Sequence, residues 1–151
     1  MRSGGTILIG VGNPFRRDDG AGWAVLQCLR SKIPPGVMVR EETGDGAELL
    51  EAWKGVHCVI LVDAIQSGAS PGTIHRLDAR MEKLPIWFFH SSTHSFGVAE
   101  AIELARTTGE LPAEFLVYAV EGLDFSEGTD LSLEVVKAVP AAANMILSEI
   151  L

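Results

Sequence analysis

The chain has 151 residues, of which 47% are hydrophobic, and its mean hydropathy is +0.24. This composition is sufficient for a buried core, and we expect one domain over residues 1–151. The formal net charge of −8 argues against a nucleic-acid or anionic-membrane surface, because binding phosphates requires a basic patch. An acidic balance is compatible with a partner that carries a metal ion.

Both cysteines, Cys28 and Cys58, lie inside apolar stretches rather than in turns. This placement predicts reduced thiols in a reducing compartment rather than a disulfide framework. No apolar run approaches the length of a membrane span, and the N-terminal residues lack a signal-type segment of their own. We therefore expect a soluble, monomeric protein of the cytoplasm without a membrane partner.

Predicted strands and helices alternate along the chain. The first strand, at 6–9, leads into a glycine-rich loop and an amphipathic helix at 23–29. Further strands are predicted at 37–39, 58–62, 73–77 and 115–120, and further helices at 47–53, 96–105 and 132–151. The continuous apolar run at 58–62 is typical of a strand buried on both faces of a parallel sheet, whereas 73–77 alternates like an edge strand. The order predicts an α/β fold with three layers, a mostly parallel central sheet with helices on both faces.

The loop after the first strand combines glycines with two adjacent carboxylates. Gly10 and Gly12 allow a tight backbone and the close approach of another group. Asp18 and Asp19 stand where the first helix begins. One of them can cap the free N–H groups of that helix, which leaves the other for chemistry.

Two more polar side chains follow predicted strands. Asp63 ends the run at 58–62, and His94 belongs to a polar segment before the helix at 96–105. Ligands of such folds collect outside the carboxyl ends of the strands, so we expect Asp19, Asp63 and His94 to converge there. Two carboxylates and an imidazole suit a divalent ion such as nickel or zinc, and three protein ligands leave positions open for water or substrate.

Several familiar motifs fail on closer inspection. Phe15 occupies the third glycine position of a dinucleotide-binding loop, and the two carboxylates would repel a pyrophosphate. The segment 68–72 matches G-x-S-x-G by letter but lacks the strand-to-helix context of a nucleophile. Cys58 has no electropositive neighbour in the sequence.

The four histidines are not equivalent. His90 and His94 have the spacing of a helical zinc pair, but the residues between them do not favour a helix, and His94 is the better ligand. His57 and His75 stand at strand positions without acidic neighbours, so we expect them to be structural or solvated.

Taken together, these residues resemble a known family. The spacing Gly10-x-Gly12-Asn13-x4-Asp18-Asp19-Gly20-x-Gly22, the Asp63-Ala64 strand end and His94-x-x-Gly97 before a helix resemble the hydrogenase maturation proteases. The likeness covers nearly the whole chain. This family often has glutamate where Asp19 stands, and a Gly-Gly-Thr type of loop where this chain has residues 42–46.

The resemblance implies an endopeptidase that trims the C-terminal tail of a nickel-loaded large-subunit precursor of a nickel–iron hydrogenase. It also implies that Asp19, Asp63 and His94 are the metal ligands, with nickel supplied by the protease or by the substrate. Because no serine or cysteine nucleophile is evident, a metal-polarised water is the economical attacking group. Asn13 and Asp18 are candidates for holding the loop and orienting Asp19.

Two other classes stay open at this point. A non-catalytic nickel-binding checkpoint or delivery protein would use the same three residues without cutting the precursor. A nucleotide-binding regulator of the same fold class would respond to nucleotide instead.

Overall fold

The computed structural model describes residues 5–85, 89 and 95–151. Five strands form one sheet in the order β2-β1-β3-β5-β4. The strands are β1 (Thr6–Val11), β2 (Val37–Glu42), β3 (Cys58–Ile65), β4 (Ile74–Asp78) and β5 (Glu114–Glu121). Of these five strands, β4 alone runs antiparallel, and it pairs with β5. It forms one edge of the sheet, the position that its alternating sequence predicts.

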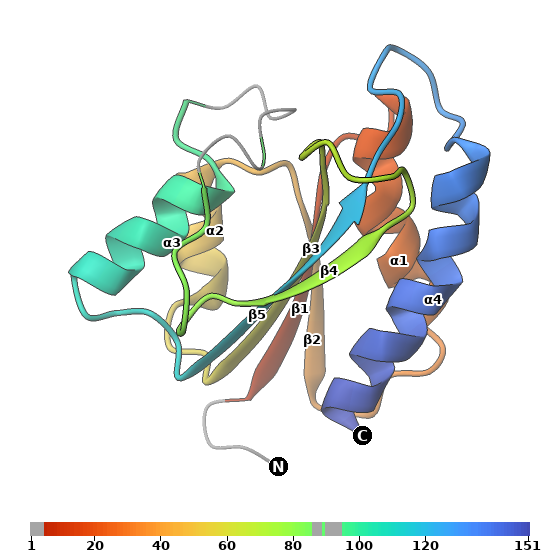
Figure 1. The fold of residues 1–151 in the computed structure, drawn as a ribbon. Coiled ribbons are helices and arrows are strands. Elements are labelled where there is room, and N and C mark those ends of the chain that lie inside the picture. Colours follow the sequence, from red (N-terminus) through yellow and green to blue (C-terminus); the bar gives the residue numbers. More distant parts are fainter. Residues whose placement is uncertain (1–4, 86–88, 90–94) are drawn as a thin grey trace.

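Helices cover both faces of this sheet (Figure 1). On one face lie α1 (Ala21–Leu29) and α4 (Leu133–Ile150), and on the other lie α2 (Gly46–Trp53) and α3 (Val98–Thr107). Each face has its own hydrophobic cluster. The predicted three-layer α/β fold is therefore confirmed.

The middle strand of the sheet, β3, is buried along its whole length. All eight residues of β3 are buried, because helices press on it from both sides and strands flank it on both edges. On the α2 side, the rings of Trp53 and Phe115 meet edge-on with centroids 4.9 Å apart. In the α1–α4 layer, the long helix α4 runs unbroken although Pro140 lies inside it at an exposed position.

The parallel strands β1, β2, β3 and β5 all end at the edge of the sheet that lies uppermost in Figure 1. The short 3₁₀ helix η1 (Arg17–Gly20) follows β1 there, just before α1. Within the described part of the chain, every buried charged side chain belongs to this edge: Asp18, Asp19, Glu42, Asp63 and Glu121. Burying a carboxylate is costly unless it is paired or hydrogen-bonded, so this edge is where a site is expected.

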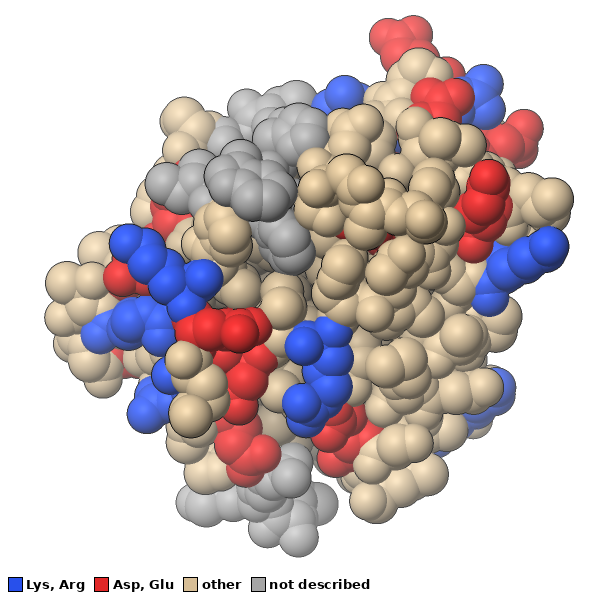
Figure 2. Space-filling view, in the orientation of Figure 1, with Lys and Arg blue, Asp and Glu red and all other residues tan. Residues whose placement is uncertain are grey.

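Three further features bear on the expectations from composition. Neither Cys28 nor Cys58 takes part in a disulfide. Across the ranges that the structure describes, no helix is both long and apolar enough to cross a membrane. On the face seen in Figure 2, acidic and basic side chains lie beside one another instead of gathering into one basic patch.

Candidate active site

The loop after β1 is shaped by contacts that only glycine allows. Gly12 has a φ of +148°, and a Cβ built there would lie 1.9 Å from the carbonyl oxygen of Asp19. A Cβ on Gly22 would lie 2.5 Å from the carbonyl oxygens of Val11 and Val62, so the start of α1 packs directly on β1 and β3. The close approach predicted for Gly12 is confirmed, and the approaching group is the backbone of Asp19.

Asp19 is held against this loop by hydrogen bonds as well. The backbone N–H of Asn13 donates to two oxygens of Asp19, the carbonyl oxygen at 3.2 Å and the side-chain Oδ2 at 3.1 Å. Only 6% of Asp19 is exposed. Asn13 thus contributes its backbone to the position of Asp19, while its own Oδ1 accepts a hydrogen bond from the N–H of Phe15.

Asp63 reaches the same place from the centre of the sheet. It lies on β3 opposite Ala119 of β5, two residues before the strand ends, because Ala64 and Ile65 continue the pairing. Its Oδ1 accepts a hydrogen bond from the N–H of Ala64 at 2.8 Å. Burial raises the pKa of Asp63 well above its ordinary value, and the nearby negative charge of Asp19 raises it further.

Two of the three predicted ligands, Asp19 and Asp63, are thus buried at the same edge of the sheet, near enough for the charge of one to act on the other. The third, His94, lies outside the described residues, as does His90. Among residues 5–85, 89 and 95–151, no three His, Cys, Asp or Glu side chains are grouped so that they could hold a metal ion. Two buried carboxylates that repel each other still fit a divalent cation, which would neutralise them with oxygen ligands. A third ligand has to come from outside the described residues or from a substrate.

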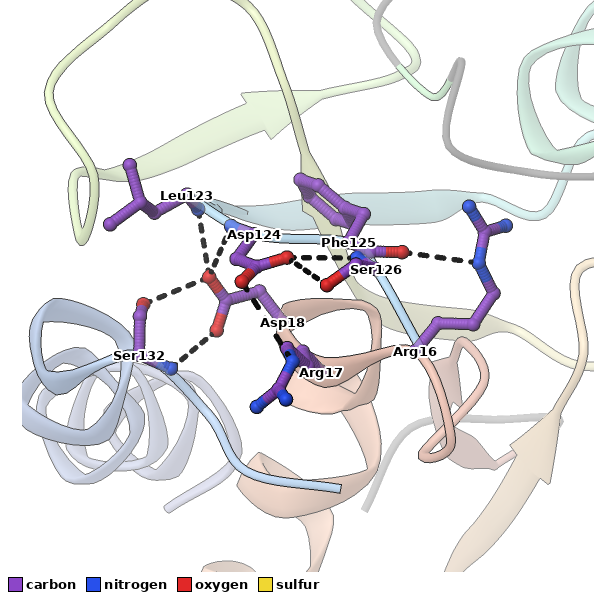
Figure 3. A network of polar contacts seen from close by, with 8 residues as sticks. All are labelled: Arg16, Arg17, Asp18, Leu123, Asp124, Phe125, Ser126 and Ser132. Carbon is purple, nitrogen blue, oxygen red and sulfur yellow. Dashed lines mark hydrogen bonds and ion pairs between the residues drawn. The ribbon is translucent and has the colours of Figure 1, made fainter. Parts of the chain in front are cut away.

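The Asp18 side chain points toward the loop between β5 and α4, where it accepts hydrogen bonds (Figure 3). Its Oδ2 accepts hydrogen bonds from the N–H of Leu123 at 2.8 Å, the N–H of Asp124 at 3.0 Å and the hydroxyl of Ser132 at 2.8 Å. Its Oδ1 accepts from the N–H of Ser132 at 2.7 Å. The expectation that one of the two carboxylates caps α1 is wrong, because α1 has no side-chain cap. The Asp18 carboxylate binds instead the loop that leads into α4.

Two buried carboxylates at this edge, Glu121 and Glu42, were not predicted from the sequence. Glu121 ends β5, accepts a hydrogen bond from the N–H of Ser67 at 3.1 Å, contacts the Ser67 hydroxyl, and lies 3.2 Å from Nε2 of His75. Glu42 ends β2, and its Oε2 lies 2.6 Å from Nε of Arg40. Burial raises the pKa of Glu42, and the charge of Arg40 offsets part of that rise. The signal that identified Asp63, an acid directly after a predicted apolar strand, was also present for Glu121, which follows the run at 115–120. It was absent for Glu42, because the predicted strand at 37–39 ends three residues earlier than β2 does.

The loop at 42–46, which departs from the family pattern, supports the start of α3. The N–H of Gly46 donates to the Phe96 carbonyl oxygen at 2.8 Å, and a Cβ on Gly46 would lie 2.4 Å from Cδ2 of Phe96. Asp45 caps α2 by accepting a hydrogen bond from the N–H of Ala47 at 3.1 Å. This loop therefore contacts Phe96, which follows His94 by two residues in the sequence.

The chain is similar in sequence to known proteins. The chain is 30% identical over 118 residues to the hydrogenase 2 maturation protease of Escherichia coli, an alignment that covers 76% of this chain and 71% of the relative. It is 27% identical over 125 residues to the hydrogenase expression/formation protein HupM of Azotobacter chroococcum, which covers 80% of this chain. The chain spans about three fifths of the length of HupM, since the match covers 59% of that relative.

The fold has solved counterparts as well. An endopeptidase from Escherichia coli superposes with a TM-score of 0.83 at 26% identity, and the match covers 95% of this chain and 90% of that one. The family model described as "HycI: Hydrogenase maturation protease" matches residues 28–149, which is most of the chain. The resemblance found in the sequence is confirmed: this chain belongs to the hydrogenase maturation protease family.

Proposed function

We propose that this chain is an endopeptidase that removes the C-terminal extension of a nickel-loaded large-subunit precursor of a nickel–iron hydrogenase. Membership of the maturation protease family supports the reaction class. The observation that supports the proposal is that two buried carboxylates at the carboxyl edge of the sheet, Asp19 of η1 and Asp63 of β3, lie near enough for the charge of Asp19 to raise the pKa of Asp63.

Asp19 and Asp63 are the proposed ligands of a divalent cation, with His94 as the third. A cation bound there would supply Lewis acidity, either to a water molecule or to the scissile carbonyl. Because burial and the charge of Asp19 raise its pKa, Asp63 holds a proton more readily than an exposed aspartate does. Binding of a cation would displace that proton, which couples cation binding to pH.

The source of the cation is part of the proposal. Nickel carried by the precursor would enter as part of the substrate, and the same two carboxylates would then recognise that the precursor is loaded. We infer that the protein works as a monomer in the cytoplasm. Cys58 is buried and Cys28 is half-buried, a placement that is expected of reduced thiols in a reducing compartment.

The proposal predicts that one molecule of this protein cuts many molecules of precursor, and this is the test. The purified protein is mixed with a large molar excess of nickel-loaded precursor, and the length of the precursor is followed by gel shift and mass spectrometry. We expect every precursor molecule to be shortened, and nickel-free precursor to stay intact. A stable complex with uncut precursor would contradict the proposal and favour a nickel checkpoint or delivery protein instead.

A further inference from the structure

All four hydrogen bonds that the Asp18 carboxylate accepts come from the loop 122–132, between β5 and α4 (Figure 3). These partners lie 105 to 114 residues away in the sequence. The side chain is 0% exposed, so both of its oxygens are removed from water and depend on these donors. A carboxylate that accepts from backbone N–H groups makes stronger hydrogen bonds than a neutral side chain would.

The backbones of the two loops are also joined. The N–H of Asp18 donates to the Asp124 carbonyl oxygen at 3.0 Å, and the N–H of Arg17 donates to that of Gly128 at 2.9 Å. In return, the N–H of Gly128 donates to the Phe15 carbonyl oxygen at 2.9 Å. The loop 122–132 therefore lies along the segment that immediately precedes Asp19.

Side chains of this segment add to the contact. Nε of Arg16 donates to the Phe125 carbonyl oxygen at 3.3 Å, and Nε of Arg17 lies 3.8 Å from Oδ2 of Asp124. Arg17 has a φ of +46°, a conformation that residues other than glycine rarely adopt. A rare conformation directly before two buried aspartates persists only where surrounding contacts enforce it.

We propose that Asp18 is a positioning residue for Asp19: by binding the loop 122–132 it fixes the peptide from which Asp19 extends. Asp19 is then held from two sides, by Asp18 and the loop 122–132 on one, and by Gly12 and Asn13 on the other. The inference rests on the proposed function, in which Asp19 binds a cation. The two adjacent aspartates then have different roles: Asp18 fixes the backbone, and Asp19 binds the cation.

The experiment compares Asp18→Asn with the unaltered protein. An amide can offer only one acceptor oxygen, so its NH₂ group would face either the N–H groups of Leu123 and Asp124 or that of Ser132. Co²⁺ alone is titrated into each metal-free protein and followed by its visible absorption, and kcat and KM for precursor cleavage are measured separately. Near-UV circular dichroism and thermal unfolding report whether each variant is folded.

We expect Asp18→Asn to fold, to bind Co²⁺ about 10- to 100-fold more weakly, and to lose kcat with little change in KM. Ser126→Ala is the matched control, because Ser126 lies in the same loop and its hydroxyl binds Asp124 rather than Asp18. It should leave Co²⁺ affinity and kcat unchanged. A folded Asp18→Asn with the Co²⁺ affinity and kcat of the unaltered protein would overturn the inference.

Three further outcomes are decisive. If Asp18→Asn does not fold, Ser132→Ala takes its place, because it removes one hydrogen bond from Asp18 and should weaken Co²⁺ binding by about threefold; no change would overturn the inference. If the unaltered protein binds Co²⁺ but cuts no precursor, the proposed function fails, while the Co²⁺ comparison still decides the role of Asp18. If it cuts precursor without binding free Co²⁺, the comparison of kcat decides.

Discussion

Gly12 faces the carbonyl oxygen of Asp19 so closely that a Cβ at position 12 would lie 1.9 Å from it. This oxygen belongs to the backbone and not to the end of a flexible side chain, so moving it would cost considerable free energy. Asp19 can therefore keep its position only if residue 12 is glycine.

Replacing Gly12 by alanine should consequently damage the site itself. We expect Gly12→Ala to lower the free energy of unfolding by about 2–3 kcal/mol and to reduce precursor cleavage by about 100-fold, because Asp19 must shift. Urea unfolding and initial cleavage rates measure the two effects.

The control for backbone strain is Gly55→Ala. Gly55 also has a positive φ, +73°, but a Cβ there would meet nothing within 4 Å. This variant should lose about 1–2 kcal/mol and keep its cleavage rate. Equal cleavage rates for the two variants would show that the contact between Gly12 and Asp19 is irrelevant to the reaction.

The second prediction concerns the pH dependence of stability. The folded protein raises the pKa of Asp63 above its unfolded value of about 3.9, so ionised Asp63 is disfavoured in the fold. Its contribution to stability is fully present below the unfolded pKa and is lost as pH rises through the folded pKa. Asp63→Asn, which keeps an acceptor for the N–H of Ala64, should therefore stabilise the metal-free protein at pH 7 and much less at pH 4.

Urea unfolding in the presence of a chelator at both pH values provides the comparison. The same variant should lose precursor cleavage, as expected when a stabilising change removes a functional charge. If the effect of Asp63→Asn on stability were the same at pH 4 and pH 7, burial and the charge of Asp19 would not raise the pKa of Asp63, and the prediction would be wrong.

The two histidines outside the described residues give a third prediction. We expect His94→Ala to fold with near-normal thermal stability without metal but to lose tail cleavage, because it removes one of three ligands. His90→Ala should retain cleavage. Gel shift of nickel-loaded precursor distinguishes them: the opposite pattern reverses the ligand assignment, and normal cleavage by both variants refutes the three-ligand hypothesis.

A fourth prediction tests the packing of α4 on the sheet. Tyr118 is the one tyrosine of the chain, and its hydroxyl donates to Oε2 of Glu149 at 2.6 Å. Burial, followed by the hydrogen bond to Glu149, raises the pKa of Tyr118 to about 12. Its contribution to stability should be complete below about pH 10 and should decline as pH rises toward 12. Absorbance titration should show ionisation near pH 12, or earlier if unfolding occurs first. A midpoint near 10 in protein that circular dichroism shows to be folded would contradict the structure.

Much of this fold follows from local sequence. The uninterrupted apolar run that begins at Cys58 predicts a central parallel strand, and the alternation at 73–77 predicts an edge strand. Asp19 and Asp63 were identified because each comes after an apolar run predicted to be a buried strand, and parallel strands present their carboxyl ends at one edge.

The polar partners could not be predicted in the same way. Asp18 binds residues 105 or more positions away, and His75 lies beside Glu121, 46 positions along the chain. Those contacts depend on how β4 registers against β5 and on where the loop after β5 returns. No local pattern encodes either, so the partners of Asp18 in the loop 122–132 were not predicted, and His75 was expected to lack an acidic partner.

The central claim is that Asp19 and Asp63 together bind the cation used in the reaction. A crystal soaked with Co²⁺ or Ni²⁺ and measured at the metal absorption edge tests it directly. We predict one anomalous peak between the two carboxylates, with an oxygen of each about 2.1 Å from the ion. An ion bound elsewhere, or bound by only one of these two aspartates, would contradict the account.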